Sequence, residues 1–113
     1  MKFKAIIAAL VLSLAIPAVA QITTVALAHE VRLSDLRLPQ ADGGTIAFRT
    51  CDDCEYQTVR VSASARWVLN GQNLTLAKFR EGLAFVQNRD EEYVTVLHHL
   101  EDNRVTQVSV QLR

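Results

Sequence analysis

The clearest pattern in the chain is an alternation of apolar and polar residues over positions 59–69. A period of two is typical of a strand with one buried face. The run exceeds the usual strand length of about 5 to 6 residues, so a bend or bulge is expected near residues 62–64. Long bent strands are typical of small barrels. The apolar positions of this run are Val59, Val61, Ala63, Ala65, Trp67 and Leu69.

A shorter alternation at residues 45–48 predicts a second strand. If it pairs with residues 57–62, Phe48 can lie opposite Val59, and the cysteine-containing segment becomes the connecting loop. This arrangement predicts a β-hairpin with the two cysteines at its end.

A second hairpin is predicted from residues 93–100 and 105–112. By parity His98 falls on the apolar side of its strand and His99 on the other, so His98 is expected to be partly buried with a hydrogen-bond partner. The apolar side chains expected to face one core are Val94, Val96, Leu100, Val108, Val110 and Leu112.

One short helix is expected after the Asn70-Gly71 turn signal. Thr75 can cap its start. Leu76, Phe79 and Leu83 then share one face, and Gly82 weakens the end of the helix. Residues 87–92 are predicted to form a solvated connection.

Residues 21–42 fit neither period cleanly, so helical and extended interpretations both remain open. Pro39 and the Asp42-Gly43-Gly44 turn close this N-terminal segment. The small domain that follows is expected to span residues 43–113. Its fold class is mainly β with one short helix, as a small antiparallel OB-like barrel or a strongly bent sheet.

The first 20 residues have the pattern of a secretory signal peptide. A basic start precedes an apolar run at residues 5–16, and an A-x-A motif ends at Ala20. The apolar run is shorter than the roughly 20 residues needed to cross a bilayer as a helix. We therefore expect cleavage near Ala20, a periplasmic or secreted protein, and no stable membrane anchor.

Charge gives little reason to expect nucleic acid as a partner. The chain has twelve basic and twelve acidic residues, and removal of Lys2 and Lys4 with the signal peptide leaves a slight excess of acids. Trp67 with Arg60 and Arg66 has the composition of an oligonucleotide or sugar surface. Parity places both arginines on the strand face opposite Trp67, which favours core packing for the tryptophan.

Cys51 and Cys54 are the only two cysteines. In an exported protein such a pair predicts a disulfide, here a local staple contributing about 2 kcal/mol at best. Acidic neighbours, among them Asp52 and Asp53, would raise a thiol pKa, which argues against a thioredoxin-like oxidoreductase. A thiol-disulfide role for Cys51 and Cys54 is kept as an alternative.

A mixed metal site is the other alternative, with Cys51, Cys54 and His98 as its ligands. His99 or His29 could stand in place of His98, and Asp52 or Asp53 could supply an oxygen donor, but His98 and His99 point to opposite faces of a strand and cannot both join. The spacing is unfavourable, because a second C-x-x-C or an H-x-x-x-H is missing. Metal is therefore not part of the main prediction, and no cofactor is expected.

No nucleophile beside a base, phosphate-cradling loop or metalloprotease helix is present in the sequence. Residues 90–92 are acidic but lack the donor spacing of a calcium loop, so a solvated loop is expected there. The predicted function is a non-enzymatic binding or structural module of the cell envelope, acting on an unidentified protein or envelope component.

The segments "WVLNGQ", "LTLAKF", "YVTVLHH" and "VTQVSVQL", in this order, resemble small exported bacterial proteins of unknown function with OB-like or related small β-barrels. The likeness covers about residues 43–112. Lys78 stands where many such sequences carry an acid at the third helical position, so the reciprocal capping box is absent. The resemblance implies a fold and supplies no functional residues.

Mass measurement with and without thiol alkylation, combined with elemental analysis, tests the predicted disulfide. An unalkylatable, metal-free pair of cysteines is expected. Stoichiometric zinc or copper would support the metal alternative, and a readily reduced pair that oxidises or reduces a client protein would support thiol exchange.

Overall fold

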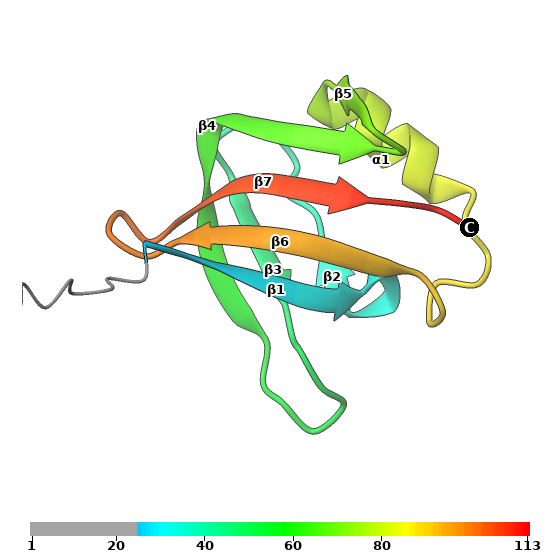
Figure 1. The fold of residues 1–113 in the computed structure, drawn as a ribbon, viewed down its shortest axis with the longest axis horizontal. Coiled ribbons are helices and arrows are strands. Elements are labelled where there is room, and N and C mark those ends of the chain that lie inside the picture. Colours follow the sequence, from blue (N-terminus) through cyan, green and yellow to red (C-terminus); the bar gives the residue numbers. More distant parts are fainter. Residues whose placement is uncertain (1–24) are drawn as a thin grey trace, which may run out of the picture.

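A computed structural model describes residues 25–113, so the predicted signal peptide lies outside the described residues. These residues form a mainly β fold in which a single sheet curls into a half-barrel, with one α-helix at one end (Figure 1). None of the helices in this part of the chain has the length and apolarity needed to cross a membrane. The elements are β1 (Ala26–Arg32), the 3-10 helix η2 (Leu33–Asp35), β2 (Leu36–Arg37), β3 (Thr45–Phe48), β4 (Gln57–Leu69), β5 (Gln72–Leu74), α1 (Leu76–Ala84), β6 (Tyr93–His99) and β7 (Arg104–Val110).

The strand order β1-β6-β7-β4-β3-β2 explains the curl. β1 and β2 lie at opposite ends of this order, yet only the three residues of η2 separate them in the chain. The sheet must therefore bend until its two outer edges approach each other. The contact between the rings of His29 in β1 and Phe48 in β3, with centroids 5.1 Å apart, lies where these edges meet.

The bend predicted within the long strand is confirmed. The pairing of β4 with β7 shifts register between Val61 and Arg66. The first part of β4 pairs with β3 and the last part with β5, and Figure 1 shows β4 turning sharply between these two arms. Val61 and Trp67 are both buried, whereas Ala63, expected on the same face, is exposed because it lies in the bend.

Two register predictions need correction. Phe48 pairs with Gln57, and Val59 pairs with Ile46, so the first hairpin is offset from the predicted alignment. Leu100 belongs to the turn after β6 and is 38% exposed, although parity placed it with Val94 and Val96.

The closing hairpin of β6 and β7 is present, with a register shift between Leu97 and His98. All strand pairs are antiparallel except β4 with β7, which is parallel. The last strand of the chain thus lies in the middle of the sheet, between β6 and β4.

The segment whose conformation the sequence left open is largely extended. Residues 26–37 supply β1 and β2, and Val31 and Leu33 lie in the core. The described part of the 21–42 segment therefore packs as part of the same sheet.

The helix agrees closely with its prediction. The Thr75 side chain accepts a hydrogen bond from the backbone N–H of Lys78, and Leu76, Phe79 and Leu83 are buried. The Phe79 ring lies 5.4 Å from the Trp67 ring, which fixes α1 on the end of the half-barrel. The buried apolar core comprises Val31, Leu33, Leu36, Ile46, Phe48, Val59, Val61, Trp67, Leu76, Phe79, Leu83, Val94, Val96, Val105, Val108 and Val110.

Replacing Phe79 by alanine should remove most of this helix-to-strand packing. We expect a loss of roughly 3–5 kcal/mol in the free energy of unfolding, measured by urea denaturation, because the ring is completely buried. The matched control is Phe85→Ala, since Phe85 follows the same helix but is 84% exposed. Its expected change is within about 0.5 kcal/mol. Equal losses in both variants would contradict the described packing.

Candidate functional site

A buried carboxylate joins the two edges of the half-barrel. Asp35 ends η2, and its side chain is only 5% exposed. Arg32 at the end of β1 donates to Oδ2 from Nε at 3.1 Å and from Nη2 at 3.0 Å. Arg49, just after β3, donates from Nε to Oδ1 at 2.9 Å, and its backbone N–H donates to the Asp35 carbonyl at 3.2 Å. Both carboxylate oxygens are thus held by guanidinium groups, one from the end of edge strand β1 and one from the residue that follows β3.

Two opposing effects set the pKa of Asp35. Burial by itself would raise this pKa, but the hydrogen bonds from Arg49 and Arg32 and their positive charges outweigh it. The pKa of Asp35 therefore lies below its ordinary value. A carboxylate held ionised with both oxygens occupied serves as a structural link and is poorly suited to act as a general base.

The disulfide loop is tied to the same two arginines. The sulfurs of Cys51 and Cys54 lie at bonding distance, which fits the predicted disulfide, and the Cys54 N–H donates to the Cys51 carbonyl at 3.2 Å. Arg32 also contacts the Asp52 carboxylate, while Arg49 donates from Nη1 to the Asp52 carbonyl at 2.8 Å. The loop is therefore closed by the cysteine pair and is also held, through Arg32 and Arg49, where the ends of β1 and β3 lie close together.

An aromatic ring extends this arrangement on the outside. The guanidinium carbons of Arg37 and Arg49 lie 4.5 Å and 5.1 Å from the centre of the Tyr56 ring. A guanidinium group over the face of an aromatic ring is attracted by the negative charge of that face. Tyr56 thus helps to hold the loop that follows the cysteines.

The histidines lie apart from the disulfide loop. His98 is buried, and its Nε2 lies 2.7 Å from Oδ1 of Asn103, as expected for a strand histidine with a partner. The His29 ring lies 5.7 Å from the His98 ring, and its own Nε2 is buried without a described hydrogen-bond partner. Burial, and then the nearby His98, lowers the pKa of His29, which favours its neutral form.

The structure does not bring His98 together with Cys51 and Cys54 as metal ligands. Among residues 25–113, the group of three potential ligands that lie close together is His99, Glu101 and Asp102, with ligand atoms within 4.8 Å of one another. His99 is the last residue of β6, and Glu101 and Asp102 lie in the turn that follows it. Nδ1 of His99 lies 2.6 Å from Oδ1 of Asp102. These groups have the chemistry to hold a divalent cation at an exposed position.

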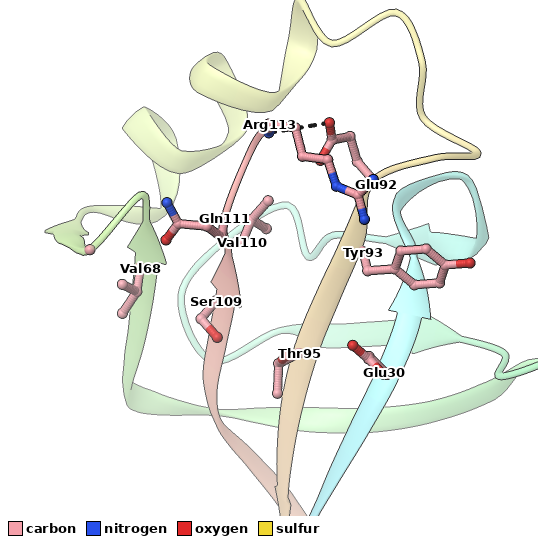
Figure 2. Close-up of a pocket in the computed structure, with 10 residues that line it drawn as sticks. Glu30, Val68, Glu92, Tyr93, Thr95, Ser109, Val110, Gln111 and Arg113 are labelled. Carbon is pink, nitrogen blue, oxygen red and sulfur yellow. Dashed lines mark hydrogen bonds between the residues drawn. The ribbon is translucent and has the colours of Figure 1, made fainter.

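A shallow depression of about 360 Å³ lies on the convex side of the sheet (Figure 2). Figure 2 shows Thr95 and Ser109 on neighbouring strands at its floor, with Glu30 and Tyr93 on one side and Gln111 on the other. These side chains offer hydrogen-bonding groups and one aromatic ring. Such a surface is suited to binding a polar partner and holds no nucleophile paired with a base.

Glu92 at the rim of this depression departs from the prediction of a solvated 87–92 connection. It is 3% exposed, and its Oε1 accepts a long hydrogen bond of 3.4 Å from the backbone N–H of Arg113. The backbone carbonyl of Glu92 accepts from the Leu33 N–H at 2.8 Å. The alternation of the sequence contains a signal for this burial. Val94 and Val96 face the core, and Glu92 is the preceding alternate position, which faces the same side.

Comparison of the chain with protein-family models, curated proteins and solved structures finds no match.

Asp35→Asn should destabilise the protein at neutral pH by about 1–3 kcal/mol, because Arg32 and Arg49 lose the ionised acceptor that the buried Asp35 carboxylate provides. The folded pKa of Asp35 lies below 3.8. Its stabilisation is therefore complete above that value and is lost as the pH falls through the folded pKa. Urea denaturation across pH should show a steeper acid loss for the wild type than for Asp35→Asn below about pH 4.

The control for this experiment is Asp53→Asn, which removes an exposed carboxylate from the same loop. Asp53 forms no ion pair with any residue of the described chain. Stability at neutral pH should stay at the wild-type value. A neutral-pH loss in Asp53→Asn equal to that in Asp35→Asn would rule out a special role for Asp35.

Proposed function

We propose that this chain is an exported, non-enzymatic binding module of the cell envelope. It contacts a protein or envelope component through the outer face of its sheet. The outer face is defined here as the convex side of β1, β6, β7 and of β4 from position 60 onwards. Its residues are Glu30, Arg60, Arg66, Val68, Tyr93, Thr95, Arg104, Gln107 and Ser109.

The observation that carries the proposal is the difference between the two sides of the sheet. The core side chains and α1 lie on the concave side, and no described element covers the outer face (Figure 1). Tyr93 is 47% exposed at the edge of the depression, beside the exposed Thr95 strand position. Tyrosine is enriched at protein interfaces, because its ring is apolar and its hydroxyl group can form a hydrogen bond.

The state of the reactive groups also supports a binding role. Asp35 is held between two arginines, His98 is bonded to Asn103, and Cys51 lies at bonding distance from Cys54. Each of these three groups is occupied by a partner within the fold, so none of them is free to act on a substrate.

Site-specific photo-crosslinking in intact cells tests the proposal. A photoreactive amino acid at Thr95 should give a discrete adduct in the envelope fraction, because Thr95 lies on the outer face. The control position is Ala77, an exposed residue of α1 on another side of the molecule. No adduct is expected there.

Adducts from Ala77 that match those from Thr95 would contradict recognition through the outer face. Absence of adducts from both Thr95 and Ser109 would contradict it as well. The cell fraction that contains the protein tests the localisation separately.

A further inference from the structure

Two arginines face each other across the only parallel strand pair of the described sheet. Arg60 of β4 pairs in register with Arg104 of β7. Residues paired in this way project from the same side of the sheet. Both side chains are exposed, while their neighbours Val61 and Val105 are buried on the concave side. Arg60 and Arg104 therefore lie together at the end of the outer face near the β4 bend.

This arrangement is unfavourable for an isolated sheet. Like charges directly opposite each other on neighbouring strands repel and reduce stability. Within residues 25–113, neither Arg60 nor Arg104 forms an ion pair or a side-chain hydrogen bond. The next residue in this row, His99 of β6, is bonded to Asp102. Asp102 and the neighbouring Glu101 are the acidic groups at this end, and neither forms an ion pair with the two arginines.

The chain has enough acidic residues to pair with its arginines. The chain carries as many acidic as basic residues, and the other arginine cluster, at Asp35, is compensated by carboxylates. Further along β4, Arg66 is also exposed and donates only to the neutral Gln107 side chain, at 3.3 Å. At one end of the outer face, therefore, two paired arginines form no ion pair within the described residues.

We propose that Arg60 and Arg104 together bind the phosphate group of an anionic ligand. Guanidinium groups bind phosphate oxygens through paired N–H donors. The backbones of neighbouring strands lie about 4.8 Å apart, so the two arginine side chains begin close to each other. An oxyanion between them replaces like-charge repulsion by two attractive contacts. The inference rests on the proposed function, because it assigns a ligand class to one end of the same outer face.

Arg66 lies beyond the bend in β4 and extends the positive area along the outer face. Inorganic phosphate, a phosphate ester and a phospholipid headgroup share the chemistry that Arg60 and Arg104 recognise. The experiment therefore uses inorganic phosphate and lipid vesicles as separate probes.

The first measurement is a titration with inorganic phosphate, followed through the side-chain Nε–H signals of the arginines by NMR. Sodium chloride at matched ionic strength serves as the reference, because salt alone screens the repulsion. The Arg60 and Arg104 signals should shift in a saturable way with phosphate and not with chloride. Absence of a phosphate-specific, saturable shift would overturn the proposal.

The second measurement compares variants of equal charge change. Arg60→Gln or Arg104→Gln should weaken phosphate binding by about tenfold, as expected for loss of a charge-assisted contact. Lys78→Gln removes one positive charge from the exposed side of α1 and should leave the affinity unchanged. Equal weakening by Lys78→Gln would show a general charge effect and overturn the site.

Co-sedimentation with vesicles distinguishes the source of the phosphate. The vesicles contain either phosphatidylcholine alone or phosphatidylcholine with phosphatidylglycerol. Binding to the phosphatidylglycerol vesicles that is lost in Arg60→Gln assigns the site to lipid headgroups. Phosphate binding without vesicle binding supports the site and assigns it to non-lipid phosphate.

Failure of this inference can be told apart from failure of the proposed function. Crosslinks from Thr95 with no response of Arg60 and Arg104 to phosphate would remove only the ligand assignment. A saturable phosphate response with no crosslink from Thr95 would support the oxyanion site and contradict recognition at the depression.

Discussion

The bend in β4 is the constraint on which the rest of this structure depends. One strand must pair with β3 at its start and with β5 at its end while keeping Val61 and Trp67 on a common core. A flat strand of this length would carry these two side chains far apart across an open sheet. The register shift after Val61 and the exposure of Ala63 show where the strand turns instead.

The turn in β4 also brings together the two edges of the sheet. Once the edges approach, His29 can contact Phe48, and Asp35 can accept hydrogen bonds from Arg32 and Arg49. Burying an ionised carboxylate is costly, so this link is favourable only when both guanidinium groups reach it. The ion pairs therefore hold the curled form and contribute little to an open one.

Local patterns in the sequence predicted the elements well. The period of two over residues 59–69 gave the long strand and its bend, and the spacing of Leu76, Phe79 and Leu83 gave the helix with its Thr75 cap. These predictions succeed because a strand or helix places neighbouring residues by fixed geometry. Local patterns do not predict the parallel pairing of β4 with β7, because this pairing depends on which distant segments of the chain meet.

The same division applies to the candidate sites. Two cysteines in one short loop predicted their own pairing, because no other cysteine competes. The partners of Asp35 were not predictable, since Arg49 lies 14 residues away and reaches it only in the curled sheet. Pairing of Arg60 with Arg104 depends on the parallel register, which no local pattern specifies.

The position of β7 between β6 and β4 has a consequence for how this chain acquires its structure. Val105, Val108 and Val110 complete the core and come from the last strand. The half of the sheet that contains β1 and β6 cannot join the half that contains β3 and β4 until that strand is present. The long-range contacts that this arrangement requires favour slow folding, because the two parts of the sheet can join only through β7.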